Sequence, residues 1–143
     1  MPAATRLTAQ AVAMAMAGLL LLASCAHMEA QDQAKKLEAA VRNYVLAVRW
    51  GNYGAAVRYL RGRDGEMPKP DLDALEGIKV TQYDYAIDAA APGATEARMT
   101  AAFEYYYVDT RVVRKTYQQS LWWWDTDHQV WFMEGNLPDF PRK

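Results

Sequence analysis

The window of residues 121–132, LWWWDTDHQVWF, holds the residue types in this chain that are best suited to binding or catalysis. Four tryptophans flank Asp125, Asp127 and His128, whose side chains are of the kinds that ligate metal ions. Aspartate is also common in hairpin turns, where its carboxylate binds nearby backbone N–H groups. Carboxylates confined to one tight turn rarely converge on a single ion. We therefore expect a turn here, with no metal and no cofactor.

Cys25 is the only cysteine of the 143 residues, and it closes the first apolar stretch of the chain. Arg6 precedes this stretch, which contains no acidic residue, and small residues come before the cysteine. This is the layout of a secretory signal peptide. The stretch is too short and too rich in small residues for a good membrane span. A single thiol cannot form an internal disulfide. Cys25 is therefore either a modified cysteine, a free cysteine in an uncleaved helix, or a cysteine next to an ordinary signal peptide.

Residues 22–25, read as Leu22, Ala23, Ser24 and Cys25, resemble the lipobox of bacterial lipoproteins. The resemblance implies cleavage before Cys25 and acylation of its thiol and new amino terminus. Several acyl chains hold firmly, since each buried CH₂ adds about 0.8 kcal/mol. Ala26 stands where many proteins retained in the inner membrane carry Asp, so the resemblance implies the inner leaflet of the outer membrane, facing the periplasm. We predict a signal peptide (1–24), a lipidated terminus and polar tether (25–33) and one domain (34–143).

After the tether, apolar residues recur at helical spacing and predict a long helix with one buried stripe. The stripe comprises Leu37, Val41, Tyr44, Val45 and Val48. Gly51 is expected to end this helix, and Asn52 to cap a short second helix that runs through Leu60. Asp71 is expected to cap one further helical turn before Gly77.

From residue 78 onward, β-branched and aromatic residues dominate between turn signals. Four strands are predicted, at 78–90, 96–108, 111–124 and 129–135. Helices followed by an antiparallel meander indicate an α+β domain. The near-neutral charge, with 16 basic and 17 acidic residues, argues against nucleic acid as a partner. Arg58, Arg61 and Arg63 form a small basic cluster that we expect to be solvated; beside a membrane it would meet anionic headgroups.

Two-residue hairpin turns predict the register of the last three strands. A turn at Asp109 and Thr110 places Glu104 opposite Lys115, a favourable pair of opposite charges. A turn at Thr126 and Asp127 places Trp122 opposite Trp131. A slip of one residue in this last turn would move Trp131 to the other face.

Alternation along the strands assigns side chains to two faces. The inner face is expected to hold Met99, Ala101, Phe103, Tyr105, Tyr107, Trp122, Trp124, Trp131 and Met133, with Thr116, Gln118 and Ser120 as polar members and Tyr83, Tyr85 and Ile87 as further candidates. The outer face is expected to hold Arg98, Glu104, Lys115, Gln119, Leu121, Trp123, Val130 and Phe132. The charged residues mark the second set as the solvent side.

Three segments resemble the nuclear-transport-factor-two-like (cystatin-like) superfamily: residues 51–60 (GNYGAAVRYL), the hairpin around 108–111 (VDTR) and residues 121–140 with their tryptophans and Leu-Pro-Asp-Phe ending. The resemblance implies a cone in which short helices and one long N-terminal helix pack on a curved four-stranded antiparallel sheet. Enzymes of this superfamily, such as ketosteroid isomerase, place an acid or base on the inner wall. Tyr83, Asp84 and Asp88 are the candidates, and only Tyr83 is predicted to face inward.

The inner face admits two readings, a packed core or a pocket for a small apolar ligand. The pocket wall would comprise Tyr83, Tyr85, Phe103, Tyr105, Trp122, Trp124 and Trp131. On the outer face, Leu121, Trp123, Val130 and Phe132 would form an interface for a homodimer or an envelope protein. Our leading hypothesis is a lipid-anchored, non-catalytic interaction module. A periplasmic ligand-binding domain is the alternative, and a ketosteroid-isomerase-like enzyme is a remote third.

Overall fold

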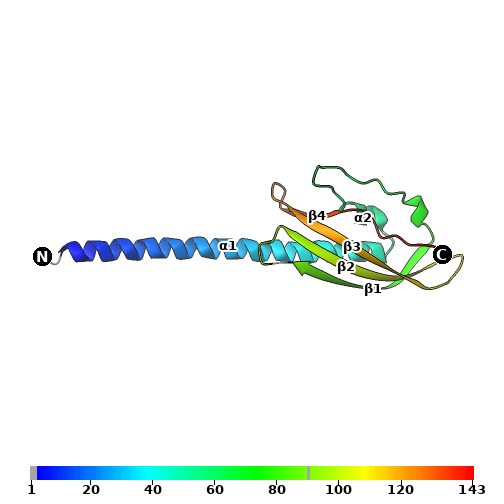
Figure 1. Cartoon of the computed structure of the whole chain (residues 1–143), viewed down its shortest axis with the longest axis horizontal. Coiled ribbons are helices and arrows are strands. Elements are labelled where there is room, and N and C mark those ends of the chain that lie inside the picture. Colours follow the sequence, from blue (N-terminus) through cyan, green and yellow to red (C-terminus); the bar gives the residue numbers. More distant parts are fainter. Residues whose placement is uncertain (1–2, 90) are drawn as a thin grey trace.

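The computed structural model describes the backbone of residues 3–89 and 91–143, and the side chains of residues 24–89 and 91–143. One long helix, α1 (Ala3–Arg49), packs its C-terminal part against a four-stranded antiparallel sheet (Figure 1). Residues 27–33, expected as a tether, are helical. The α+β class predicted from the sequence is confirmed.

The buried face of α1 is the predicted stripe. Leu37, Val41, Tyr44, Val45 and Val48 are all buried. The helix ends as expected at Gly51, whose φ of 69° lies in the left-handed region. Gly51 N donates to Val48 O at 3.1 Å and Asn52 N donates to Ala47 O at 2.8 Å, which is the hydrogen-bond pattern of a Schellman cap.

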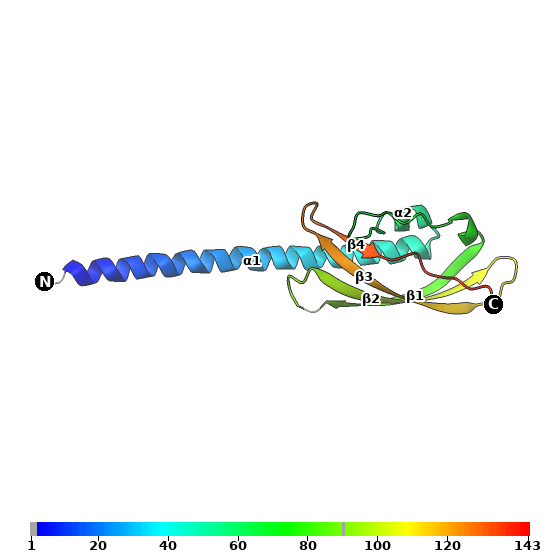
Figure 2. The same ribbon diagram turned by 45° about the horizontal axis from the view of Figure 1, so that its top comes forward.

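The chain then crosses to the side of α1 opposite β1, where α2 (Tyr53–Val57) lies (Figure 2). Asn52 caps α2 as predicted, but the helix stops at Val57 rather than Leu60. Leu60 instead forms a parallel bridge with Met133, and Arg61 N donates to Met133 O at 3.0 Å. Bonding to the open edge of the sheet satisfies the backbone groups at residues 59–61, so the helix does not continue.

The four strands are β1 (Ile78–Ala89), β2 (Glu96–Tyr107), β3 (Arg114–Asp125) and β4 (Val130–Glu134), in the order β1-β2-β3-β4. Their bounds lie close to the predicted ones; Ala90 falls outside the described residues. The single turn η1 (Asp73–Leu75) precedes β1. As expected, Asp71 bonds to its start: Asp71 Oδ1 accepts from Asp73 N at 3.1 Å and from Ala74 N at 3.3 Å. A bulge between Val80 and Gln82 lets Val80 and Tyr83 share a face.

The predicted register is right for one hairpin and wrong for the other. Glu104 pairs with Lys115 as expected, although the ladder ends at Tyr105 and Arg114, so the turn is longer than two residues. In the last hairpin, Trp122 pairs with Met133, not with Trp131. The turn here spans four residues between Asp125 and Val130, with Gln129 at a φ of 54°. The register moves by two residues, and an even shift keeps every side chain on its predicted face.

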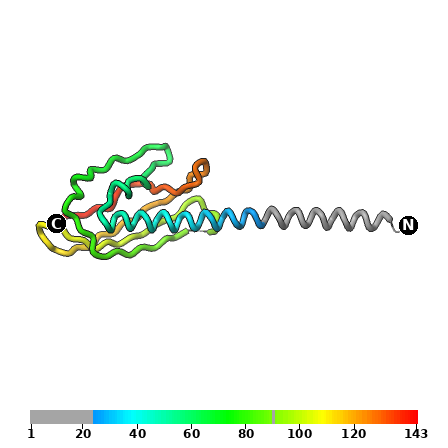
Figure 3. The backbone as a smooth tube through the Cα atoms, turned by 180° about the vertical axis from the view of Figure 1, so that it is seen from behind, coloured from blue at the N-terminus to red at the C-terminus, as the bar shows by residue number. Residues whose placement is uncertain are grey.

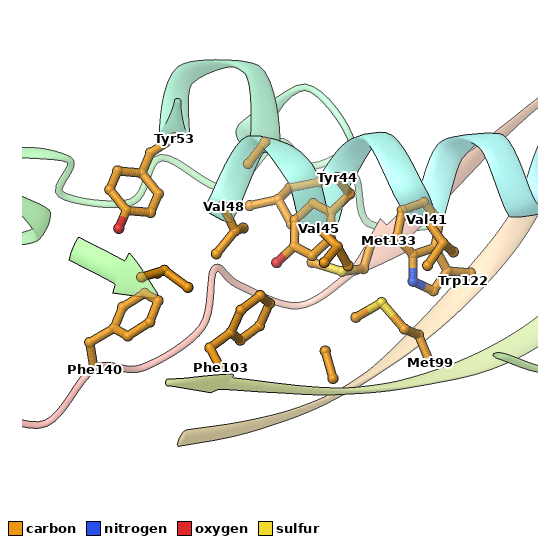
Figure 4. Close-up of a cluster of buried hydrophobic side chains, with 14 of the residues drawn as sticks. Val41, Tyr44, Val45, Val48, Tyr53, Met99, Phe103, Trp122, Met133 and Phe140 are labelled. Atoms are coloured by element: carbon orange, nitrogen blue, oxygen red, sulfur yellow. The ribbon is translucent and has the colours of Figure 1, made fainter. Parts of the chain in front are cut away.

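The core lies between α1 and the inner face of the sheet, including the first half of β1 with Ile78 and Val80. Figure 4 shows Met99, Phe103, Trp122 and Met133 directed toward the buried stripe of α1. All four side chains are completely buried. Tyr44 joins the helix to the sheet, because its ring lies 5.8 Å from the Trp122 ring in an edge-on arrangement.

Candidate functional site

The seven residues expected to line a pocket occupy three environments. Phe103, Tyr105, Trp122 and Trp131 are buried in the core, Tyr85 and Trp124 are half-buried, and Tyr83 is 40% exposed at the edge strand. Helix α1 also packs against the first half of β1, where Ile78 and Val80 are buried, so only the second half of that strand, from Tyr83 on, is partly open on its inner side. A cavity of about 660 Å³ lies elsewhere, between the 62–70 loop and residues 134–136.

The C-terminal segment fills the end of the inner face that α1 does not reach. Figure 3 follows this segment from β4 past the C-terminal end of α1. Phe140 is 4% exposed, and its ring lies 4.9 Å from that of Tyr105, 6.3 Å from Phe103 and 6.4 Å from Tyr53. The segment therefore plugs an aromatic recess in the sheet (Figure 4).

Four side chains of the inner face bind the backbone of this segment. Gln118 Nε2 donates to Asn136 O at 3.0 Å, and Thr116 Oγ1 donates to Asp139 O at 2.8 Å. Tyr107 Oη donates to Phe140 O at 2.7 Å, and Tyr105 Oη donates to Pro141 O at 2.6 Å. Two donors come from β2 and two from β3, so the paired strands together hold the segment.

The sequence analysis placed Thr116 and Gln118 on the inner face but did not predict their partners in residues 136–141. The missed signal was the polarity of those positions, because buried polar side chains need partners. The carbonyls of the segment supply them. Ser120, the third inward polar residue, has its buried hydroxyl without a partner among the described residues.

The expected interface residues lie on the outer face, where they form a partly covered patch. Trp123 and Phe132 are cross-strand partners whose ring centroids lie 5.5 Å apart, Leu121 is half-buried, and Val130 is 40% exposed. The indole Nε1 of Trp123 donates to Arg61 O at 2.9 Å. The loop that follows α2 thus covers one side of this outer-face patch and is hydrogen-bonded to it through Arg61 O.

Two of the three arginines expected to be solvated contact this face. The Arg61 guanidinium lies 5.1 Å from the centroid of the Phe132 ring, a cation–π contact. Arg63 forms ion pairs with Glu96 at 2.6 Å and Glu134 at 3.7 Å. Only Arg58 is simply exposed.

Asp125 organises the turn that the sequence offered as a metal candidate. Its Oδ1 accepts from Asp127 N at 3.0 Å and from His128 N at 3.2 Å, and its Oδ2 lies 2.9 Å from His128 Nδ1. These bonds, led by that of the His128 side chain, hold the pKa of the Asp125 carboxyl below its usual value. Within the described residues, no group of three or more His, Cys, Asp or Glu side chains is arranged to hold a metal ion.

The acid and base candidates are not gathered into one site. Asp84 and Asp88 are exposed, and Asp84 Oδ1 accepts a hydrogen bond from the adjacent Tyr85 N at 2.9 Å. Tyr83 shares the face of Phe103, its partner on β2, but lies at the uncovered edge. The three side chains therefore show no common hydrogen-bonded arrangement.

The lipobox residues lie at the limit of what the structure describes. The side chains of Leu22 and Ala23 fall outside the described residues, whereas Ser24 and Cys25 are exposed on α1. Contact with the sheet begins a few residues later, where Trp131 Nε1 donates to Gln33 O at 3.0 Å and Gln33 Nε2 donates to Ala94 O at 2.8 Å. Across the part of the chain that is described, no helix has the length and hydropathy to span a bilayer.

Comparison with known proteins adds no relative. No family model, curated protein or solved structure matches this chain.

Proposed function

We propose that this protein is a lipid-anchored, non-catalytic interaction module of the cell envelope that docks a protein partner through the outer face of its sheet. The observation that carries the proposal is the outer-face patch of Leu121, Trp123, Val130 and Phe132. Apolar patches with a charged rim favour protein partners. The rim here is provided by Arg63 with Glu96 and Glu134.

The filled inner face supports a surface role over a ligand-binding one. Helix α1 covers one part of the aromatic wall and Phe140 occupies another. The scattered positions of Tyr83, Asp84 and Asp88 likewise favour a protein without a catalytic site. A helix packed on a four-stranded antiparallel sheet is compatible with the nuclear-transport-factor-two-like fold, and we assign the chain to that superfamily as part of this proposal.

The anchor would hold the domain close to a membrane. Cys25 lies on exposed helix eight residues before Gln33, the first residue bonded to the sheet. At about 1.5 Å of rise per residue, the helix between them spans about 12 Å. Acylation of Cys25 would therefore bring the turns at 91–95 and 126–129 near the bilayer surface, in the outer membrane by the sorting argument from Ala26.

Lipidation is tested by Cys25→Ser in the cell of origin. We expect the variant to accumulate as an uncleaved or soluble form and to lose labelling by a fatty-acid analogue, since the acceptor thiol is gone. Ala26→Ser, one position later, is the matched control and should be labelled and cleaved. Labelling of Cys25→Ser would refute the anchor, and recovery of the native protein with inner-membrane fractions would contradict the outer-membrane assignment.

The docking face is tested by Val130→Lys in the full chain. A charge in the outer-face patch, at its exposed end beside the β3–β4 turn, should abolish the dimer or complex seen by native mass spectrometry of the protein purified from a cell extract. Val113→Lys serves as control, because Val113 is 61% exposed in the β2–β3 turn, away from the patch. If Val130→Lys leaves the assembly intact, the outer face is not the interface. A bound apolar ligand in the same spectra would favour the ligand-binding alternative.

A further inference from the structure

The C-terminal segment, residues 136–143, is held as a bound peptide would be. It contains no helix or strand and pairs with no strand of the sheet. Its four described hydrogen bonds to the inner face all run from side chains of β2 and β3 to backbone carbonyls of the segment. Because the donors are side chains, the groove recognises an extended backbone without requiring it to join the sheet.

The composition of the segment matches this mode of binding. Pro138 and Pro141 fix φ near −65°, carry no N–H group, and disfavour helix at the preceding residue. Pro138 and Phe140 are buried while Asp139 and Pro141 are exposed, which is the alternation of an extended chain. Proline-bracketed segments with pre-set backbones are typical ligands of aromatic grooves.

The recess around Phe140 contains one hydrogen-bond donor that does not bond to the segment, the Tyr53 hydroxyl. The hydroxyl of Tyr53 is buried and has no partner among the described residues, although its ring lies 6.4 Å from that of Phe140. Figure 4 shows Tyr53 and Phe140 facing each other across this recess. Most buried hydroxyls in folded proteins are paired, so this one is a donor that a carbonyl of a differently placed segment could use.

Gly135 joins the segment to the domain and has the conformational freedom of a hinge. Gly135 has a φ of 116°, is exposed, and has no neighbouring atom within 4 Å of where a Cβ would stand. Rotation there would release the segment without disturbing β4, which ends at Glu134. Exchange of an end segment between identical chains at such a hinge is a low-cost route to association.

From these contacts we infer that the groove formed by Tyr105, Tyr107, Thr116 and Gln118, with the recess for Phe140, is a peptide-binding site. Its ligand is an extended Pro-x-Phe-Pro segment. The chain's own residues 136–143 occupy it in cis, and the same segment of a second copy occupies it in trans. The inference stands apart from the lipid anchor and from the outer-face patch.

The test uses the full chain in detergent with a protease site inserted between Gly135 and Asn136. After cleavage, the segment is held only by the groove. A fluorescent peptide with the sequence of residues 136–143 should then replace it, with binding followed by anisotropy. The uncut chain should bind the same peptide at least about a hundredfold more weakly, because the tethered segment competes at an effective concentration in the millimolar range.

Two peptide variants establish whether the groove is the site. A peptide with Phe140→Ala should bind at least about tenfold more weakly, since it loses the aromatic plug. A peptide with Asp139→Ala, altered at an exposed position, should bind as the parent does. The inference would be overturned if the cleaved chain keeps its original segment through extensive dilution and exchange. It would also be overturned if the Phe140→Ala peptide binds as tightly as the parent peptide.

A second variant avoids the inserted site. Phe140→Ala in the uncut full chain weakens the binding of the segment in cis, so this chain should bind the labelled parent peptide more tightly than the uncut wild-type chain does. Failure of both the cleaved chain and this variant to bind peptide would show that the segment is only part of the core.

A separate experiment tests whether the segment of a second copy occupies the groove. Cleaved chain freed of its segment should form a one-to-one complex with uncut chain, as measured by sedimentation. Free peptide should dissolve that complex, and absence of the complex while peptide binds would overturn the trans claim.

Discussion

At the scale of single residues, adjacent tryptophans have opposite roles. Trp122 is completely buried against Tyr44, whereas Trp123 lies on the outer face and is held by Arg61 O and the Phe132 ring. Alternation along β3 causes this difference, so a run of identical residues here does not form one site.

Truncating each tryptophan should therefore have unequal effects on folding. Trp122→Ala should lower the free energy of unfolding by about 3–5 kcal/mol, the usual cost of removing a buried large aromatic. Trp123→Ala should cost about 1–2 kcal/mol, because it loses one hydrogen bond and a half-buried ring contact. Urea unfolding of both variants measures the two values. The reverse order would mean that the faces are interchanged.

Buried tyrosines make stability sensitive to high pH. Burial raises the pKa of Tyr53 from 10.0 to about 12, so the folded state keeps a proton that the unfolded state loses. Stability from this group is fully present below pH 10 and disappears as the pH rises toward 12. Tyr53→Phe should show a smaller loss of the urea midpoint over that range than the parent. An unchanged pH dependence would exclude Tyr53 as a contributor.

At the scale of elements, caps and turns set where each helix and strand ends. Gly51 ends α1 with a positive φ, and Asp125 organises the four-residue β3–β4 turn. Both devices were readable in the sequence, but the length of the turn was not. Asp125 accepts hydrogen bonds from Asp127 N and His128 N, and His128 lies beyond the two-residue turn that we expected.

The cap of α1 should favour glycine at residue 51. Gly51→Ala should cost about 1–2 kcal/mol, since a Cβ disfavours the left-handed conformation. Gly54→Ala is the matched control: it lies in α2 with open space around its Cβ position, and it should be neutral or slightly stabilising. Thermal melts of the pair report the difference. Equal effects would show that the cap does not require a positive φ.

The β3–β4 turn should weaken in acid. The lowered pKa of Asp125 means that its contribution to stability is present above its usual pKa of 3.8 and disappears as the pH falls through the lower value of the folded state. Asp125→Asn should therefore lose less stability than the parent between neutral and acid pH. Asp127→Asn, in the same turn, is the control, and melting temperatures across the pH range give the comparison. An acid dependence as steep in Asp125→Asn as in the parent would contradict this assignment.

At the scale of the whole molecule, α1 has two parts with different support. Residues 24–29 are exposed, whereas residues from Leu37 to Val48 carry the buried stripe. Gln33 marks the boundary through its bonds to Trp131 and Ala94. Helices gain most of their stability from packing rather than from propensity.

Hydrogen exchange should expose this boundary. Amides of residues 26–30 should exchange orders of magnitude faster than those of residues 41–48, which open only with the whole domain. Gln33→Ala should extend the fast-exchanging segment toward Leu37, because it removes the bond to Ala94. Equal protection along the helix would contradict this division.

The sequence alone was sufficient for the class, the helix stripe, the strands and the two faces of the sheet. These features depend on short periodicities, and an even error in register leaves the faces unchanged, as the pairing of Trp122 with Met133 rather than Trp131 shows. Glu104 opposite Lys115 was predictable for a similar local reason, the favourable pairing of opposite charges.

Only the tertiary structure decided how the inner face is closed. The stop of α2 at Val57 depends on Leu60 reaching Met133, and the binding of Phe140 depends on Thr116 and Gln118 reaching carbonyls about twenty residues away. Such contacts join segments that share no periodicity, and they form because buried donors must find acceptors wherever the chain brings them. The C-terminal segment, which looked like an exit from the sheet, became the plug of its aromatic recess for that reason.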